Sequence, residues 1–222
     1  MKSEGLSIEW DDYLVALRED AHQLLAWGYL DTRCELSVAR DEYDMTGLIA
    51  AAMDRRISDP QTPERFTMYS VHNEQPISPH GELGKNRPRL DIQIERCAAR
   101  PKRYFTVEAK RLRDDTISSV ADTLVHYLGD EGVGRFIAAR YAGESVEAAM
   151  LGCIQAHDAR FWFERIAGAF TQDKASGHNL FCLIEELSWE MVIPDLPDEA
   201  ASSHKRNGRD PIRLFHILVD CR

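Results

Sequence analysis

Apolar side chains near the start of the chain recur three or four residues apart, which is the period of an α-helix. The pattern covers residues 8–27, and Gly28 follows it directly. It predicts one amphipathic helix that ends at the glycine. Residues 32–35 (Thr-Arg-Cys-Glu) have the form of a capping box, and the periodic positions after them predict a second helix over residues 40–56.

Two later segments alternate apolar and polar side chains, which is the pattern of a half-buried strand. They cover residues 89–97 and 103–112, and a short turn region separates them, so together they predict a hairpin. By the same reasoning we predict strands at 66–71, 150–155, 180–185 and 212–219, helices at 116–128, 132–142 and 159–170, and a surface loop at 194–211.

Helices and strands therefore mix along the whole chain of 222 residues, and neither an internal repeat nor a linker interrupts them. A chain of this length is able to bury a sizeable core without disulfides. We expect residues 1–222 to form a single α/β domain, in which helices flank a mixed central β-sheet.

The composition is that of a soluble globular protein, with 44% apolar and 29% charged residues. The first residues lack the apolar stretch of a signal peptide, and no apolar run approaches the roughly 20 residues that cross a bilayer. The five cysteines are scattered and contain no C-x-x-C pair, which predicts buried thiols in a reducing cytosol. We therefore expect a cytoplasmic protein without a membrane partner.

Charge is unevenly distributed along the chain. The formal net charge is −10, yet residues 85–113 contain ten Lys or Arg against three acidic residues, a local excess of +7. The remainder of the chain then carries about −17. One basic segment in an acidic protein indicates a single surface for a polyanion, and a solvated basic hairpin is the alternative interpretation.

Several short motifs do not support a function. Residues 81–85 lack the spacing of a phosphate loop, and residues 129–134 lack the surrounding βαβ unit of a dinucleotide site. The histidines show neither a zinc spacing nor the H-E-x-x-H pattern, and no G-x-S-x-G elbow is present. These absences leave the predicted hairpin as the place to look for chemistry.

The polar faces of this hairpin carry a set of ionisable groups that suits one reaction. Asp91 lies on the first strand, and Glu108 and Lys110 lie two residues apart on the second, so the latter two side chains point to the same side. Two carboxylates offer the hard oxygen ligands that Mg²⁺ prefers, together with water and phosphate oxygens. A lysine beside them is able to orient the attacking water or to help deprotonate it, so the set suits phosphodiester hydrolysis.

This arrangement resembles the PD-(D/E)xK nuclease superfamily, in which an acid lies on one strand of a hairpin and E-x-K lies on the next. Residues 89–91 (Arg-Leu-Asp) stand in for Pro-Asp, and residues 107–110 (Val-Glu-Ala-Lys) match the apolar-E-x-K pattern. The resemblance implies a restriction-endonuclease-like αβββαβ core over about residues 35–155, with elaborations before and after it. It also implies a Mg²⁺-dependent endonuclease, in which Mn²⁺ is able to substitute.

The resemblance further implies an acid on the preceding helix. On the predicted second helix, Asp41 and Glu42 flank the centre of the apolar stripe on opposite sides, so helical geometry leaves both open. The longer side chain and the family pattern favour Glu42. Glu35 already has a structural role in the expected capping box. The expected metal ligands are then Asp91, Glu108 and Glu42, and the expected catalytic residues are these three and Lys110.

Nucleic acid is the expected partner, with DNA as the first choice and RNA as the other class. The candidates for phosphate contacts are Arg87, Arg89, Lys102, Arg103, Arg111 and Arg113. Tyr127, Arg135 and Tyr141 follow the motif at positions that are able to approach the site. We expect target choice to come from loops, from a homodimer or from another protein. The resemblance alone suggests a role in bacterial restriction or phage defence.

Two rival functions stay open at this point. A catalytically silent nuclease-like module would bind nucleic acid or a protein partner, and its binding would be indifferent to Mg²⁺ and to Lys110. An enzyme of unrelated chemistry would instead contain an activated cysteine thiol. Cleavage assays on DNA and RNA with a Lys110→Ala control separate these cases from a nuclease.

Overall fold

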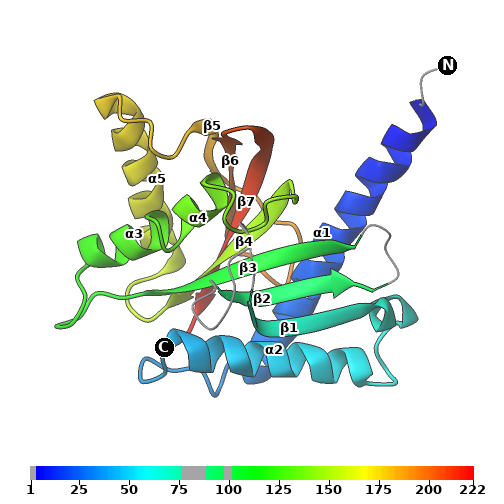
Figure 1. The fold of residues 1–222 in the computed structure, drawn as a ribbon. Coiled ribbons are helices and arrows are strands. Elements are labelled where there is room, and N and C mark those ends of the chain that lie inside the picture. The colour runs from blue at the N-terminus through cyan, green and yellow to red at the C-terminus, as the bar shows by residue number, and fades with distance from the viewer. Residues whose placement is uncertain (1–3, 77–88, 98–101) are drawn as a thin grey trace.

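Seven strands form one β-sheet in the computed structural model of this protein, which describes residues 4–76, 89–97 and 102–222 and side chains from residue 12 onwards (Figure 1). The strands are β1 (Tyr69–Pro76), β2 (Arg89–Arg96), β3 (Arg103–Leu112), β4 (Glu147–Ile154), β5 (Leu183–Trp189), β6 (Glu199–Arg206) and β7 (Arg209–Asp220). The helices are α1 (Glu4–Thr32), α2 (Glu42–Ser58), α3 (Val120–Leu128), α4 (Val133–Ile137) and α5 (Ala159–Ser176), with the short 3₁₀-helix η1 (Glu64–Met68) before β1.

The sheet combines antiparallel and parallel pairs in the order β1-β2-β3-β4-β7-β6-β5. β1, β2 and β3 pair antiparallel in succession, β3 pairs parallel with β4, and β4 pairs parallel with β7. β6 then returns antiparallel to β7, and β5 pairs antiparallel with β6. The expected α/β class, a mixed sheet with flanking helices, is therefore confirmed.

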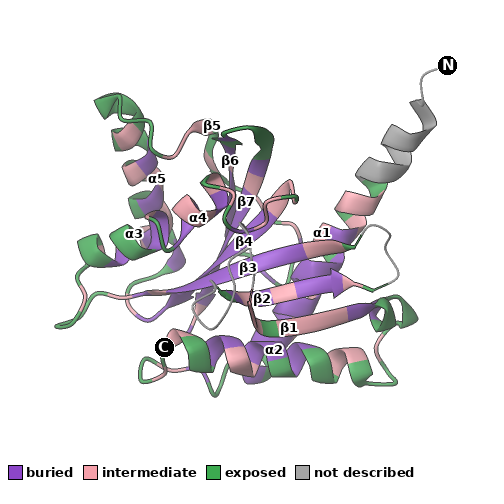
Figure 2. Cartoon of the chain, in the orientation of Figure 1, coloured by how far each residue is buried: buried purple, intermediate pink, exposed green. Residues whose placement is uncertain are grey.

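Each face of the sheet buries its own hydrophobic core. α1 and α2 pack on one face, where Leu24 and Ile49 meet strand residues such as Phe105. α3, α4 and α5 lie on the other face, where the core contains Tyr127 and Trp162. Figure 2 shows the strands between these layers largely in the colour of buried residues. Successive side chains of a strand point to opposite faces, so β4 and β7 contribute to both cores.

α1 and α2 cross at Gly28, which the sequence pattern predicts to be the end of the first helix. That prediction is wrong, because α1 continues to Thr32. A Cβ atom at position 28 would lie 2.6 Å from Met53 Cγ and 2.8 Å from the carbonyl oxygen of Ile49. Gly28 therefore serves the close approach of two helices, where no side chain fits, and does not serve as a stop.

We expect Gly28→Ala to lower the free energy of unfolding by about 1–2 kcal/mol, because overpacking against α2 outweighs the better helix propensity of alanine. Gly168 is the matched control, since it lies inside α5 and a Cβ atom there would meet nothing within 4 Å. Gly168→Ala should raise the free energy of unfolding by up to about 1 kcal/mol. Urea denaturation of both variants tests this difference, and equal stabilisation by both would contradict it.

The capping box predicted at residues 32–35 is wrong. Thr32 is the last residue of α1, and its hydroxyl donates a hydrogen bond to the Gly28 carbonyl at 2.7 Å. Asp41 is instead the N-cap of α2, and its carboxylate accepts from the backbone amide of Asp44 at 2.8 Å. Threonine is able to bond a carbonyl one turn earlier in its own helix, so the tetrapeptide pattern does not distinguish a beginning from an end.

The surface loop predicted at residues 194–211 is also wrong. This segment contains β6 and the first residues of β7, and Ser202 and His204 within it are buried. Asn207 and Gly208 form the turn between the two strands, and Gly208 has a φ of 68°. An Asn-Gly pair is a strong hairpin signal, but the polar composition of the segment masks it.

The other predicted elements differ from the structure mainly at their boundaries. β3 covers the predicted residues 103–112, and β2 ends one residue earlier than predicted. β1 begins only at Tyr69, because the residues before it form η1. α3 begins only at Val120, because Ser119 caps it. The predicted helix 132–142 is reduced to α4, which ends before Ala139, a residue with a φ of 54°.

A chain of buried hydrogen bonds joins β6 and β7 to the helices above them. His204 Nδ1 lies 2.8 Å from the Phe181 carbonyl oxygen, which only accepts, so this nitrogen carries the hydrogen. His204 Nε2 therefore accepts from the Ser202 hydroxyl at 2.7 Å, and Ser202 accepts from His216 Nε2 at 2.9 Å. His216 Nδ1 then accepts from the Tyr127 hydroxyl at 3.1 Å. Every member is satisfied when both imidazoles are neutral.

Two features relate to the expected cellular environment. Of the five cysteines only Cys153 and Cys221 are buried, so the prediction of buried thiols fails for the other three. Cys34 lies in the turn after α1 and Cys97 follows the end of β2, where the chain leaves the packed layers.

None of the described helices is long and apolar enough to cross a membrane.

Candidate active site

The β2–β3 hairpin places Asp91 and Glu108 on the sheet face that points away from α1 and α2. Ile92 pairs with Val107, and both are buried in the core beneath α1 and α2, so the residues next to them point to the opposite face. Regular pairing of the strands ends there, and Asp91 Oδ2 accepts from the backbone amide of Ala109 at 2.7 Å. The carboxylate thus replaces the missing strand partner.

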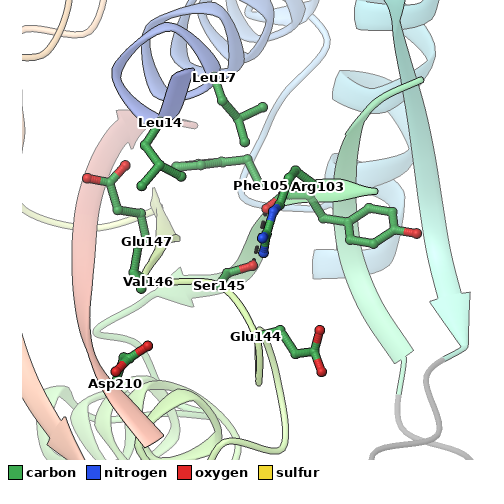
Figure 3. A pocket seen from close by; sticks show the side chains of 10 residues that line it. Leu14, Leu17, Arg103, Phe105, Glu144, Ser145, Val146, Glu147 and Asp210 are labelled. Atoms are coloured by element: carbon green, nitrogen blue, oxygen red, sulfur yellow. Dashed lines mark hydrogen bonds between the residues drawn. The ribbon is translucent and has the colours of Figure 1, made fainter. Parts of the chain in front are cut away.

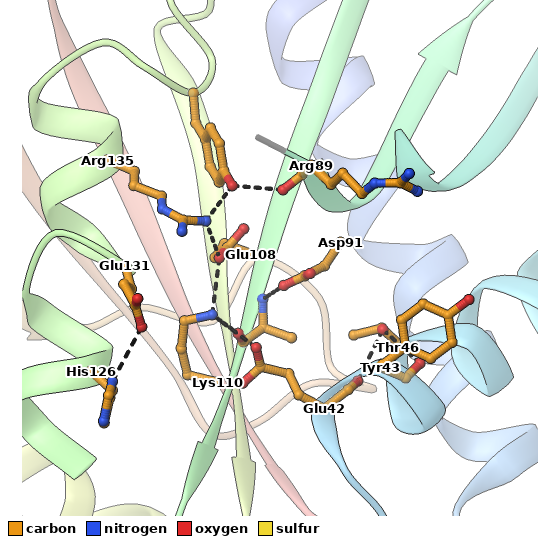
Figure 4. A network of polar contacts seen from close by, with 12 residues as sticks. Glu42, Tyr43, Thr46, Arg89, Asp91, Glu108, Lys110, His126, Glu131 and Arg135 are labelled. Carbon is orange, nitrogen blue, oxygen red and sulfur yellow. Dashed lines mark hydrogen bonds and ion pairs between the residues drawn. The ribbon is translucent and has the colours of Figure 1, made fainter. Parts of the chain in front are cut away.

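Lys110 lies at the centre of the polar cluster (Figure 4). Its Nζ donates to Glu42 Oε1 at 2.9 Å, to Glu108 Oε1 at 2.9 Å and to the Ala109 carbonyl oxygen at 2.7 Å. An ammonium group has three hydrogens, so these acceptors use all of them. Lys110 therefore ties the start of α2 to the middle of β3.

The structure distinguishes the two helix acids that the sequence leaves open. Asp41 caps α2, whereas Glu42 in the first helical turn points at Lys110 (Figure 4). Glu35, which the sequence assigns to a capping box, is exposed in the turn that follows α1. Glu42 is therefore the acid of this helix that joins Asp91, Glu108 and Lys110.

Two of the three residues expected near the site reach it. Arg135 Nη1 donates to Glu108 Oε1 at 3.2 Å and also contacts the hydroxyl of Tyr141. The Tyr141 hydroxyl donates in turn to the Arg89 carbonyl oxygen at 2.6 Å. Tyr127 does not approach the cluster, because it is fully buried and donates to His216. Arg135 thus holds Glu108 by a hydrogen bond, and Tyr141 links Arg135 to the backbone of Arg89.

Burial dominates the electrostatics of the two carboxylates. Desolvation raises the pKa of Glu108 to about 8, and the nearby charge of Asp91 adds to the rise. Desolvation likewise raises the pKa of Asp91 to about 6, against the lowering effect of Lys110. Burial alone lowers the pKa of Lys110, but the carboxylates around it outweigh that effect and the net shift is upward. Lys110 is therefore a stable ammonium group beside two carboxylates, Asp91 and Glu108, whose ionised forms burial destabilises.

Glu108 keeps one oxygen without a partner. Only 1% of this residue is exposed, and Lys110 and Arg135 both bond to Oε1. The other oxygen, Oε2, is buried and has no hydrogen-bond partner in the described part of the chain. A buried carboxylate oxygen without a donor is costly, so it marks a place where a cation or water stabilises the protein.

The described residues contain no ready group of three or more His, Cys, Asp or Glu side chains that holds a metal ion. The ammonium group of Lys110 lies between Glu42 and Glu108, where it supplies the positive charge these acids share. The unpartnered Glu108 oxygen and the raised pKa values of Asp91 and Glu108 nevertheless fit an additional hard cation beside them.

A cleft of about 420 Å³ opens beside Lys110. Arg111 and Arg113 line it together with Thr123 and His126 of α3, and the acids Asp122 and Glu131 also line it. Arg113 Nε donates to Asp115 Oδ2 at 2.7 Å, which holds its guanidinium in place. The cleft thus joins the carboxylate cluster to two of the six basic residues expected to contact phosphate. The sequence does not indicate the α3 residues, because nothing in their spacing relates them to β3.

The remaining basic candidates have different positions. Arg87, like the discarded motif at residues 81–85, lies outside the described residues. Arg89 contributes its carbonyl oxygen to Tyr141, and its side chain is exposed. Lys102 is exposed and forms an ion pair with Glu95 at 2.6 Å. Arg103 lines a separate hollow beyond the cluster.

Comparison of the chain with family models, curated proteins and solved structures found no significant match. The resemblance to the PD-(D/E)xK superfamily therefore stays a prediction from the residues of this chain.

Proposed function

We propose that this protein is a metal-dependent nuclease that hydrolyses phosphodiester bonds of DNA, with RNA as the other substrate class. The observation that carries the proposal is the set of contacts by which Lys110 joins Glu42 to Glu108, beside Asp91 and at the mouth of a cleft with basic residues. Carboxylates, an ammonium group and guanidinium groups in one cleft suit a reaction at a phosphate.

The order of elements around the site supports the family resemblance. Helix α2, strands β1 to β3, helix α3 and strand β4 follow one another as α-β-β-β-α-β, apart from the short helices η1 and α4. The acid lies on β2, and E-x-K lies on β3 beside it. On this proposal α1 and the elements after β4 are additions to a restriction-endonuclease-like core, and the biological role is bacterial restriction or phage defence.

A divalent cation belongs to this proposal, Mg²⁺ in the first place and Mn²⁺ as a substitute. The residues that would hold it are Asp91, Glu108 and, as a third acid, Glu42. Oε2 of Glu108 has no hydrogen-bond partner among the residues that the structure describes. When bound, such an ion acts as a Lewis acid that stabilises negative charge on phosphate oxygens. It would also offset the burial that is the main cause of the raised pKa of both acids, because a nearby positive charge stabilises their ionised forms.

The side chains of the cluster divide the remaining work among them. Lys110 stays protonated, so it orients a phosphate oxygen or the attacking water by hydrogen bonding and does not act as a base. It becomes available to the substrate when it gives up one of its contacts with the chain, and Glu42, 31% exposed, is the partner nearest to solvent. Arg135 holds Glu108 in position, and Arg111 and Arg113 contact neighbouring phosphates.

A catalytically silent nuclease-like module is the second candidate, and one observation favours it. All three hydrogens of Lys110 already have acceptors within the chain, so the cluster is a complete structural network without a ligand. Such a module would bind nucleic acid or a partner protein through the cleft. Incubation with plasmid, single-stranded DNA and RNA, with Mg²⁺, Mn²⁺ or EDTA, decides between the two candidates. Metal-dependent products support the nuclease, and intact substrates under every condition overturn it.

We expect Glu42→Gln to lower the rate of Mg²⁺-dependent cleavage about tenfold or more, because it removes a charged partner of Lys110 and an acid from the proposed cation site. Asp41→Asn is the matched control on the adjacent residue. Asparagine also caps helices well, so this variant should keep its activity and lose less than about 1 kcal/mol of stability. Initial cleavage rates and urea denaturation measure both effects. Equal rates for the two variants would remove Glu42 from the site.

A further inference from the structure

A second basic hollow lies on the same sheet face as the candidate active site. It has a volume of about 380 Å³ and is lined by four cationic residues, Lys102, Arg103, Arg140 and Arg209, against the single carboxylate of Glu144 among its described lining residues. We call these residues and the space between them the basic pocket. Its positive excess contrasts with the net charge of −10 for the whole chain.

Two of these cations have no carboxylate partner among the described residues. Arg140 and Arg209 are both exposed, and neither forms an ion pair with a carboxylate in the described part of the chain. They come from segments far apart in the sequence, the loop after α4 and the start of β7. The fold therefore brings two available guanidinium groups to one hollow, where repulsion disfavours them unless an anion is present.

A third guanidinium group lies behind the wall of the pocket. Arg206 is only 2% exposed, and it donates to the backbone carbonyl oxygens of Asp210, Ala142 and Ser145 at 2.7, 3.0 and 2.9 Å. It forms no ion pair with any carboxylate among the residues that the structure describes. A buried positive charge held only by carbonyls adds a positive field to the pocket that solvent does not screen well.

The loop that carries Arg140 is held in an unusual backbone conformation. Ala139 and Ala142, on either side of Arg140 and Tyr141, have φ values of 54° and 49°, a region that alanine rarely adopts. Tyr141 bonds the Arg89 carbonyl oxygen and contacts Arg135 of the candidate active site. A strained backbone of this kind persists only where the surrounding contacts hold it. Here the contacts of Tyr141 hold the loop, and they thereby fix the position of Arg140 relative to the candidate active site.

The pocket lies one strand repeat from the candidate catalytic residues. Gln93 and Thr106 form a cross-strand pair that lines it, and each is two residues from Asp91 or Glu108 on the same face. Two residues of a strand correspond to roughly 7 Å, or about two nucleotides of rise along one DNA strand. Beyond the cluster in the other direction, β3 leads to Arg111 in the 420 Å³ cleft.

A smaller hollow of about 150 Å³ adjoins the basic pocket and shares Arg103, Tyr104, Glu144 and Ser145 with it. Figure 3 shows that Leu14 and Leu17 of α1 form part of its wall, and that Arg103 points toward Ser145. Its lining is thus partly apolar, which does not suit an anion. The basic pocket is the hollow of the two whose chemistry matches phosphate.

We infer that the basic pocket binds a phosphate about two nucleotides along the nucleic acid strand from the phosphodiester that lies at the Asp91–Glu108–Lys110 cluster. This inference rests on the proposed function. Arg140 and Arg209 contact the phosphate, because guanidinium groups match its geometry with paired hydrogen bonds. Tyr104, which also lines the pocket, stacks on an adjacent base. An unpaired strand exposes its bases for such stacking, so the preferred substrate is single-stranded or has a frayed end.

The test measures the binding of a fluorescein-labelled 12-residue oligothymidylate by anisotropy, in EDTA, so that cleavage plays no part. Arg140→Ala/Arg209→Ala should raise the Kd about tenfold at 100 mM salt. It should also reduce the slope of log K against log salt by about 0.7, the contribution of one neutralised phosphate of a single strand. Tyr104→Ala should weaken binding about fivefold and leave the slope unchanged, because stacking releases no counterions.

The matched control is Arg55→Ala/Arg160→Ala, which removes the same charge from exposed positions on α2 and α5. Its Kd should change by no more than about twofold, and circular dichroism confirms folding of each variant. If Arg140→Ala/Arg209→Ala and the control bind alike, or if the wild-type protein does not bind the oligonucleotide, the pocket assignment is overturned. Displacement of the oligonucleotide by an equal phosphate concentration of thymidine monophosphate would assign the pocket to free nucleotides and overturn the strand assignment.

Cleavage assays on the same variants separate this inference from the proposed function. Loss of oligonucleotide binding in Arg140→Ala/Arg209→Ala, without Mg²⁺-dependent cleavage by the wild-type protein, supports the pocket and overturns the nuclease. Cleavage by the wild-type protein, with unchanged binding and rate in Arg140→Ala/Arg209→Ala, supports the nuclease and overturns the pocket.

Discussion

Lys110→Ala should lower the rate of Mg²⁺-dependent cleavage by about 100- to 1,000-fold, the usual effect of removing one preorganised donor to a reacting phosphate or acyl group. Lys110 remains protonated and donates to both Glu42 and Glu108, whereas Arg135 donates to Glu108, so the variant removes the cation that joins these two acids. Initial rates on a single-stranded substrate measure the loss. Lys174→Ala is the matched control, because Lys174 is also paired with a glutamate, Glu186, but on the surface of α5.

Glu108→Gln should abolish cleavage to a similar degree without destabilising the fold. Burial and Asp91 raise the pKa of Glu108 to about 8, above the ordinary value of 4.5, so the ionised form costs stability as pH rises from 4.5 to 8. Glutamine keeps the shape and removes this cost. The melting temperature at pH 8 without divalent cations should therefore stay the same or rise. Full activity of Glu108→Gln or Lys110→Ala would overturn the nuclease proposal.

Between pH 7 and pH 5, the wild-type protein should lose roughly 3–4 kcal/mol of its free energy of unfolding relative to the variant His204→Gln/His216→Gln. Burial lowers the pKa of His204 to about 4 and that of His216 to about 3, from 6.5. The unfolded chain therefore binds more protons than the native state between these values and 6.5. The stability contributed by the neutral histidines is present above pH 6.5 and is lost as the pH falls toward 4.

The direction of the hydrogen bonds in this network also predicts that protonation of the two histidines destabilises the folded protein. Phe181 fixes the hydrogen of His204 on Nδ1, so protonation of Nε2 would oppose the Ser202 hydroxyl that donates to it. Asp91 and Glu108 change stability in the opposite sense over the same pH range, because their pKa values are raised. Comparison with the glutamine variant cancels their effect. Parallel urea-denaturation results for both proteins at pH 7 and pH 5 would show that the histidines do not titrate as described.

The hairpin and its E-x-K motif could be predicted from the sequence because they depend on local geometry. Alternation with a period of two places Glu108 and Lys110 on one face of β3 whatever the rest of the chain does. Asp91 follows from the same argument, since the short connection between β2 and β3 makes them neighbours in the sheet. These three residues therefore lie together as the pattern predicts, while their roles in catalysis stay a prediction.

The errors fall where a local pattern has two structural outcomes. The Thr32 side chain bonds a carbonyl inside α1, although its tetrapeptide has the form of a helix start. Residues 199–206 are polar or small in composition, yet they form β6, because β5 and β7 pair with both of its edges and bury Ser202 and His204. Composition reports the side chains of a segment but not the surfaces that cover it.

The sequence by itself determined the class of elements, the pairing of β2 with β3, and the set Asp91, Glu108 and Lys110, because each follows from backbone periodicity over a few residues. Only the tertiary structure decided that Glu42 and not Asp41 meets Lys110, 68 positions away in the chain. It alone brought Arg140 and Arg209 to one pocket. The physical reason is that such contacts depend on how whole helices and strands pack, and packing is set by the summed burial of both cores, which no short pattern contains.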